Sequence, residues 1–383
     1  MRAEYEVAHV LTRSWDNVVS SGLNSWQIRT LRAIRDCRTI ALGGHVDACD
    51  GCGHIQISYN SCRNRHCPKC QGHKRIQWIE ARETELLPVP YFHVVFTLPD
   101  DLNGLALHKP KIVYDALFKA AWETIEAFTG KGNKAGMISI LHTWGQNLSL
   151  HPHIHCIIPG GFVDSNNTWK ISKNQGKFLF PVKAMSKVYR AKYVALLRAS
   201  ELEIEQSTFD VVFKKEWVVY AKRPFGSPKS VVEYLGRYTH KIAISNHRIL
   251  SIDDQSVTIS YKDYRAEGQT KTMTLNHEEF VRRFALHILP KRFVRIRHYG
   301  ILSSTWKRSK LTDLQSKLNA IALTSWPIVI KGTYHKCCPC CKTGQMIILL
   351  TFGRRGPPSE FYKVAQEKST SQSRHLTISP YNT

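Results

Sequence analysis

The stretch HTWGQNLSLHPHIHCIIPGG, residues 142–161, carries four histidines and ends in an apolar run and two glycines. Two short apolar runs, MISILH leading into it and HIHCIIP within it, are typical of β-strands. His153 and His155 project from the same face of such a strand, because side chains alternate with a period of two. If the two runs pair as antiparallel strands, His142 returns beside them. The stretch therefore predicts a metal site of His142, His153 and His155.

Histidines also occur without a metal, hydrogen-bonded in a core or on a polar surface. For a lone histidine that interpretation is preferred, but the H-x-H pair, its apolar continuation and the upstream histidine favour a metal. His151 shares the strand parity but precedes Pro152, which limits regular pairing, so it is the weaker candidate. Gln146 is a spare candidate.

Around this stretch, strands and helices follow one another without regular β-α alternation. β-Branched and aromatic runs predict strands at 91–98 and 216–224, and a hairpin over 247–264 that turns near Asp253–Gln255. Helical periodicity covers residues 1–45, 73–87, 107–128, 183–202 and 227–241. The economical fold class is α+β, an antiparallel sheet flanked by helices with an amino-terminal helical and zinc-binding module.

Four regions are expected along the chain. Residues 1–87 form the helical, zinc-binding and DNA-binding module, and residues 88–300 form the catalytic domain. Residues 301–352 form a basic, cysteine-containing region. The tail, 353–383, is polar and punctuated by glycine and proline, so we expect it to be disordered.

Eleven cysteines in a chain without an export signal are better explained by metal ligation than by disulfides. Two C-x-x-C pairs fourteen residues apart predict one structural zinc ion bound by Cys49, Cys52, Cys67 and Cys70. Possible substitutes between the pairs are Cys62, His54 and His66. A later group, HKCCPCCKTG at 335–344, has Cys338 and Cys341 at the same spacing. It is either a half-site completed by His335 or by distant ligands, or a metal-free turn.

The charge balance indicates a polyanionic partner. The chain has 54 basic and 30 acidic residues, a formal net charge of +24, which points to nucleic acid. The stretch LPKRFVRIRHYGILSSTWKRSK, residues 289–310, interleaves cations and aromatic rings, a pattern suited to phosphates and bases or to an ordinary solvated face. No apolar run is long enough to span a bilayer, and the expected location is the cytoplasm.

The segment SVVEYLGRYTHK places Tyr234 and Tyr238 four residues apart, on one face of an expected helix. Alone, such a pair is more often packing. Opposite a metal site in a basic protein, a phenol can attack a polarised phosphodiester, forming a phosphotyrosyl ester and freeing a DNA 3′ hydroxyl. Deaminase and H-E-x-x-H metalloprotease patterns are absent. Imidazole ligands suit zinc, copper or nickel, but phosphate chemistry favours magnesium or manganese, which we expect here.

These residues resemble a known family, the IS91-type HUH transposases, which carry two tyrosines and an amino-terminal zinc-binding region. The resemblance covers most of the chain and rests on YNSCRNRHCPKCQ, YFHVVFTLP, LHTWGQNLSLHPHIHCIIPGG, YLGRYTHKIAISNHRI, LPKRFVRIRHYG and CPCCKTG. It implies that Tyr234 and Tyr238 are catalytic and that His142, His153 and His155 bind the catalytic metal. It also implies a single-stranded DNA transposase that nicks an element end, joins its 5′ phosphate and moves the element by a rolling-circle-like process. The doubled cysteines near the carboxyl end depart from the family pattern.

Two other classes remain open at this point. A metal-dependent nuclease using water would need the histidines without the tyrosines. A zinc-containing DNA-binding regulator would need the cysteines alone.

Overall fold

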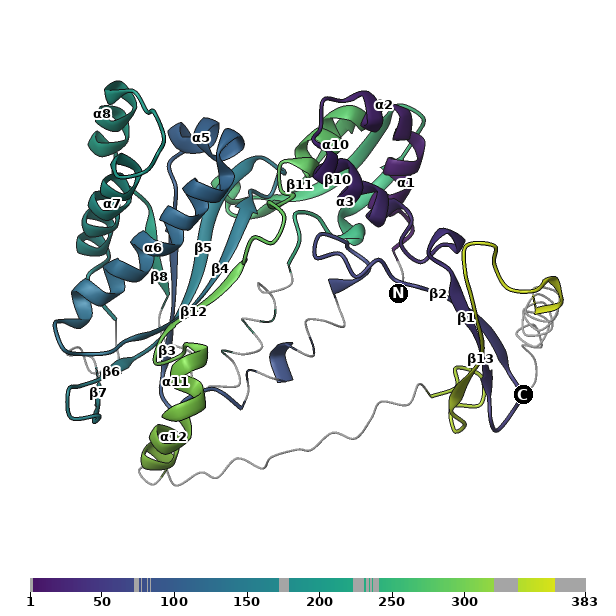
Figure 1. Ribbon diagram of the computed structural model, residues 1–383. Helices are drawn as coiled ribbons and strands as arrows, with labels where there is room; N and C mark the ends of the chain where they lie inside the picture. Colours follow the sequence, from purple (N-terminus) through teal and green to yellow (C-terminus); the bar gives the residue numbers. More distant parts are fainter. Residues whose placement is uncertain are drawn as a thin grey trace, which may run out of the picture.

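The computed structural model describes most of the chain as helices, strands and loops (Figure 1). The described residues are 3–71, 76, 78–80, 82, 84–171, 179–222, 231, 234, 236, 241–319 and 337–361. Their antiparallel sheets and flanking helices confirm the α+β class. The domain limits remain predictions, and residues 362–383 of the expected tail lie outside the described residues. No helix in the described part of the chain is long and apolar enough to cross a membrane.

A five-stranded antiparallel sheet lies at the centre, in the order β12-β4-β5-β3-β8. Its strands are β3 (Tyr91–Thr97), β4 (Gly136–Trp144), β5 (Leu150–Pro159), β8 (Val219–Lys222) and β12 (Ile296–Gly300). The first four lie where the sequence predicts strands, whereas β12 falls in the basic and aromatic stretch and is not predicted. Strand β5 continues through Pro152, whose carbonyl accepts a hydrogen bond from the Leu98 amide at 3.0 Å.

Strand β5 pairs with both of its neighbours in a register that defines the two faces of the sheet. His153 lies opposite His142 of β4 and Thr97 of β3. His155 lies opposite Ile140 and Val95. Directly opposed residues project from the same face, so this register gathers the histidines on one side.

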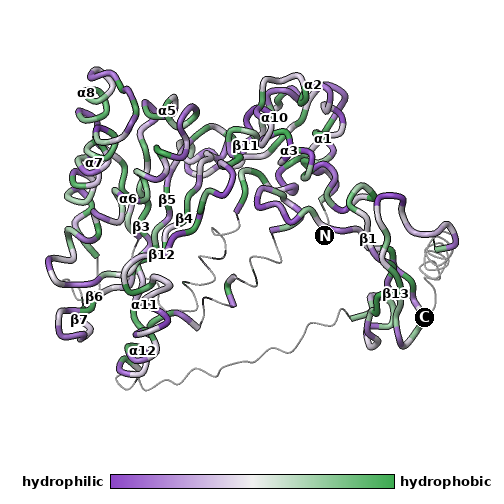
Figure 2. Tube along the Cα trace, viewed as in Figure 1, coloured by the Kyte–Doolittle hydropathy of each residue, from purple (hydrophilic) through white to green (hydrophobic). Residues whose placement is uncertain are grey.

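Two long helices, α6 (Pro110–Thr129) and α7 (Val182–Arg198), cover the other face (Figure 1). The shorter α5 (Asn103–His108) and α8 (Gln206–Lys214) accompany them. Phe92, Phe96 and Ile154 point toward these helices and are fully buried, as apolar residues alternate along each strand. Hydrophobic residues run along the central strands in Figure 2.

The histidine-bearing face is only partly covered by apolar packing. Tyr91 and Ile157 are buried there with side chains of α11 (Ser304–Ser309) and α12 (Leu311–Asn319). Val231, in the segment predicted to be helical, is fully buried in the same cluster. Val231, Tyr234 and Gly236 are the described residues of segment 227–240, and all three are helical.

The amino-terminal helices pack on a second sheet. Their bounds are α1 (Val7–Arg13), α2 (Trp15–Ser20) and α3 (Ser25–Arg35). The sheet, in the order β11-β10-β9, is formed by β9 (Ile249–Ile252), β10 (Ser256–Asp263) and β11 (Gln269–Asn276), with α10 (His277–Ala285) beside it. Leu31 and Ile34 share one core with Ile259 and Phe280. The predicted hairpin is confirmed, with Asp253 at the turn between β9 and β10.

A third sheet combines both ends of the described chain. Its order is β13-β1-β2, from β1 (Gly44–Cys49), β2 (Ile55–Tyr59) and β13 (Met346–Phe352). Figure 1 shows β13, in yellow, beside the dark β1. A small hairpin of β6 (Gly161–Val163) and β7 (Trp169–Ile171) completes the strands.

Gly300, at the end of β12, provides a test of this packing. Its φ is +55°, and an added Cβ would lie 1.9 Å from the Ala135 carbonyl oxygen and 2.8 Å from Trp122. We expect Gly300→Ala to lower the free energy of unfolding by at least about 2 kcal/mol in urea titrations. Gly104→Ala in α5, whose added Cβ meets no atom within 4 Å, is the control and should not destabilise the protein. Equal stability of Gly300→Ala and wild type would contradict the packing described here.

Candidate metal and nucleophile site

The three predicted histidines come together on the face of the central sheet opposite α6 and α7. One ligand nitrogen from each of His142, His153 and His155 lies within 4.8 Å of the other two. His142 is 2% exposed and His155 8% exposed, so the group is set into the sheet surface. Three convergent imidazoles can supply part of a metal coordination sphere and leave positions for substrate oxygens.

Hydrogen bonds orient the rings. Nδ1 of His153 donates to the carbonyl oxygen of His151 at 2.7 Å, which leaves Nε2 with the lone pair. The His142 ring stacks on Trp144, with centroids 4.6 Å apart, and the Arg295 guanidinium lies 5.3 Å from the Trp144 ring. The backbone carbonyl of His151 therefore fixes the orientation of the His153 ring.

Burial keeps the imidazoles of His153 and His155 neutral. It lowers the pKa of His153 to about 4, with a smaller contribution from the charge of Lys241. Burial, followed by the charges of His153 and His93, lowers the pKa of His155 well below its usual value. Neutral imidazoles have a lone pair for a cation, so protons do not compete with a metal at neutral pH.

His93 of β3 joins the site, although the sequence analysis did not select it. Its Nε2 lies 2.9 Å from Nδ1 of His155, and its Nδ1 lies 3.2 Å from the phenol oxygen of Tyr234. Its pKa falls to about 4 because of burial and then the charge of Lys222. Strand parity was the available signal, since residues 93, 95 and 97 of YFHVVFT share a face.

Tyr234 is thereby placed within two hydrogen bonds of the metal-site histidines. The Lys222 ammonium of β8 lies 5.4 Å from the Tyr234 ring. A cation near a phenol favours the phenolate that forms when its oxygen attacks. Tyr238, the other predicted nucleophile, lies outside the described residues.

Several cations of the 289–310 stretch have structural partners. Arg295 is buried and donates to the Leu141 carbonyl at 3.0 Å. Arg297 pairs with Asp115 and lies over the Phe118 ring. The spare candidate Gln146 accepts a hydrogen bond from Arg248 at its backbone oxygen. These contacts support the sheet edge beside the histidines.

The predicted zinc site of Cys49, Cys52, Cys67 and Cys70 is not the group that the structure brings together. Each C-x-x-C pair joins cysteines elsewhere in the chain. Two clusters result: Cys37, Cys62, Cys67 and Cys70, and Cys49, Cys52, Cys338 and Cys341. The reason is topological. Cys49 and Cys52 lie at the turn between β1 and β2, whereas Cys67 and Cys70 follow the far end of β2, so the length of the hairpin separates the two pairs.

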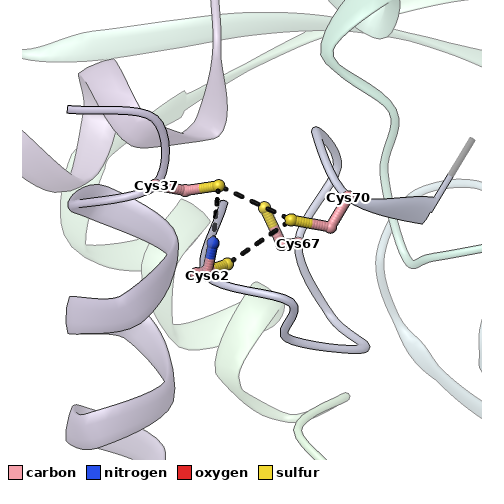
Figure 3. Close-up of side chains that lie close together, drawn as sticks. All are labelled: Cys37, Cys62, Cys67 and Cys70. Carbon is pink, nitrogen blue, oxygen red and sulfur yellow. Dashed lines mark hydrogen bonds between the residues drawn. The ribbon is translucent and has the colours of Figure 1, made fainter. Parts of the chain in front are cut away.

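The sulfurs of Cys37, Cys62, Cys67 and Cys70 converge just past the carboxyl-terminal end of α3 (Figure 3). The Cys70 sulfur lies 3.5 Å from that of Cys37 and 3.7 Å from that of Cys62. A tetrahedral zinc ion with Zn–S bonds of about 2.3 Å requires sulfurs about 3.8 Å apart. A hydrogen bond from Cys62 lowers the pKa of Cys37 to about 7, which favours a thiolate. The geometry fits a structural zinc ion.

A histidine triad beside a tyrosine on an antiparallel sheet, together with cysteine clusters that involve the amino-terminal region, is the arrangement expected of a DNA transposase. Residues 136–310 match the Y2 family model described as "Putative transposase", and residues 10–98 match the transposase zinc-binding domain. The chain belongs to the IS91 family of two-tyrosine transposases. This confirms the predicted family, with DNA as partner and zinc as the metal of the amino-terminal region.

Two relatives that cover most of the chain are described as transposases. "Putative transposase y4qJ" of Sinorhizobium fredii is 41% identical over 93% of this chain and 98% of its own length. The "Transposase for insertion sequence element IS801" of Pseudomonas savastanoi pv. phaseolicola is 27% identical over 76% of this chain and 74% of its own. No solved structure matches.

Cys67→Ser tests the first cluster. We expect the variant to lose about one zinc ion per chain, measured by elemental analysis, because the other three thiolates leave the tetrahedron incomplete. Hydrogen exchange in α1 and α3 should accelerate, since zinc binding also stabilises the fold. Cys156→Ser, a buried cysteine of β5 outside both clusters, should keep its zinc. Unchanged zinc in Cys67→Ser would exclude this ligand set.

Proposed function

We propose that this transposase cleaves and rejoins single-stranded DNA at the ends of its insertion element through a 5′-phosphotyrosine intermediate. Rolling-circle-like transposition of the element at the bacterial nucleoid follows from this chemistry. The observation that carries the proposal is the chain of hydrogen bonds from the histidine triad through His93 to Tyr234. An unpaired strand suits the site, because its backbone can bend to align a phosphate between the triad and the phenol.

A bound magnesium or manganese ion, held by Nε2 of His153, Nε2 of His155 and a ring nitrogen of His142, would polarise the scissile phosphate. Three imidazole ligands would leave such an ion free to contact oxygens of the substrate. Trp144 stacks on the ring of His142 and excludes water from that side. Lys241, whose charge reaches His153 and His155, can neutralise part of the DNA charge.

The reaction exchanges one phosphodiester for another. The phenol oxygen of Tyr234 forms a bond to phosphorus, and the bond from phosphorus to the 3′ oxygen breaks. The phenolic proton is transferred, overall, to the departing 3′ oxygen, which leaves as a hydroxyl. Bond energy is conserved in the phosphotyrosyl ester, so a second hydroxyl can reverse the step without ATP. Tyr238 would provide the second nucleophile for the other strand end.

His93 acts as a positioning residue in this scheme. If Nε2 of His155 held a cation, the proton of that imidazole would lie on Nδ1 and be donated to Nε2 of His93. His93 then carries its own proton on Nδ1, which faces the phenol oxygen of Tyr234. This N–H donates to the phenol oxygen and stabilises the negative charge that develops as its proton leaves.

Variants of the triad and of the tyrosines test the proposal. His153→Ala or His155→Ala should slow metal-dependent cleavage of an end-derived oligonucleotide by at least about a thousandfold, while much of the DNA binding remains. Tyr234→Phe and Tyr238→Phe should each remove one nucleophile, and the double variant should form no covalent protein–DNA species. Denaturing gels show the adduct, and protease digestion locates the modified peptide.

The control is Tyr264→Phe, an exposed tyrosine in the turn between β10 and β11, which should cleave as wild type does. An adduct in the double variant would exclude both tyrosines. Cleavage at the full rate without an adduct would indicate a nuclease that uses water.

His93→Phe tests the positioning role. It preserves a ring in the β3 position but removes both hydrogen bonds, so cleavage through Tyr234 should slow about 10- to 100-fold at saturating manganese. In a Tyr234→Phe background the same substitution should cost little more, because its effect passes through that phenol. Rates at saturating metal and metal affinities are measured separately.

His298→Phe is the matched control, since this histidine lies on the same sheet face but contacts Lys307. An equal additional loss from His93→Phe with and without Tyr234 would contradict the role and assign His93 to the metal site alone.

A further inference from the structure

A second group of four cysteines joins segments from the two ends of the described chain. Cys49 and Cys52 lie at the end of β1, and Cys338 and Cys341 precede β13; their four sulfurs all lie within 4.8 Å of one another. We propose that these four thiolates bind a structural zinc ion of their own. The transposase then holds two structural zinc ions, and the second closes the third sheet.

The distances between the two cysteine pairs match a tetrahedral ion. The sulfur of Cys49 lies 3.7 Å from that of Cys341, and the sulfur of Cys52 lies 3.7 Å from that of Cys338. Zinc with bonds of about 2.3 Å places its sulfurs about 3.8 Å apart. A disulfide requires about 2.05 Å, so the arrangement fits an ion between the pairs.

Backbone amides surround the sulfurs in the same way on both sides. Cys49 receives the amides of Gly51 and Cys52 at 3.3 and 3.4 Å. Cys338 receives the amide of Cys340 at 3.4 Å, and Cys341 that of Gly344 at 3.2 Å. Amide donors stabilise thiolates, which are the form that binds zinc. Zinc binding releases the remaining thiol protons to solvent.

The two turns also share a backbone conformation. The residue after the second cysteine of each pair is left-handed, Gly53 at φ +62° and Lys342 at φ +61°. Gly344 lies so close to the other turn that an added Cβ would be 2.4 Å from the Cys49 sulfur. Asp50 also links the two turns, because its carboxylate accepts a hydrogen bond from the Gln345 amide at 2.7 Å. Two facing turns of this kind form a complete four-sulfur site.

The doubled cysteines near the carboxyl end supply an internal comparison. Cys337 and Cys340 have the same C-x-x-C spacing as Cys338 and Cys341 but belong to neither cluster. The Cys337 thiol donates instead to the Lys342 carbonyl at 2.8 Å. The zinc-binding family model ends at residue 98, so two of the proposed ligands lie far outside it.

Zinc content of the full-length protein tests the inference. Cys338→Ser/Cys341→Ser should contain one zinc ion per chain fewer than wild type, whereas Cys337→Ser/Cys340→Ser should match wild type. Hydrogen exchange should show lost protection in β13 and β1 of the first variant only. Exchange in α3, beside the other cluster, should stay at the wild-type level and thus report that the rest of the chain is folded.

Gly344→Ala adds a variant that keeps every sulfur. It should also lose zinc or bind it more weakly in a chelator competition, because the added Cβ drives the two turns apart. Wild-type zinc content in Cys338→Ser/Cys341→Ser would overturn the inference. An equal loss in the control pair would overturn the ligand assignment, and iron in place of zinc would overturn the metal. None of these measurements involves DNA, so their outcome is independent of the proposed cleavage chemistry.

Discussion

The pairing of β5 between β4 and β3 is the constraint on which the rest of the site depends. It places His153 opposite His142, and His155 next to a strand that carries His93 two residues further along the same face. A slip of one residue would turn His153 and His155 into the apolar layer beneath α6 and α7 and expose Ile154 and Cys156. The buried apolar half of β5 therefore enforces the register that the chemistry requires.

Local patterns in the sequence were sufficient for this part of the molecule. Apolar and β-branched runs identified β3, β4 and β5, and the H-x-H pair with His142 selected the three histidines that the structure brings within 4.8 Å. His93 was missed because strand parity gives only the face on which a single histidine lies and not its partners on other strands. Its role depends on the neighbouring strand order, which a strand's own sequence does not specify. Tyr234 was found by its partner at i+4, although Tyr238 lies outside the described residues.

The cysteines show where local reasoning fails. A C-x-x-C spacing identifies half of a zinc site but does not say which other half completes it. Cys37 stands alone just after α3, so no spacing linked it to its partners. The pair Cys338 and Cys341 lies nearly 300 residues after Cys49 and Cys52, so its spacing did not indicate which pair completes it. The packing of α1 and α3 against β9, β10 and α10 likewise joins segments far apart in the sequence, and local patterns did not predict it. An amphipathic pattern predicts that a segment packs against another element, but the identity of that element depends on the tertiary fold.

The pairing of β13 with β1 also has a consequence for the order of events during synthesis. Strand β1 leaves the ribosome early, with β2 as its hairpin neighbour. Nearly 300 further residues must be synthesised before β13, its other neighbour, is made. At about 5 to 20 residues per second, that interval is roughly 15 to 60 s. Throughout it, one edge of β1 has unpaired backbone groups, a state that favours association with other chains. A nascent chain in which β13 has not yet been made therefore differs from the folded protein at this edge of β1.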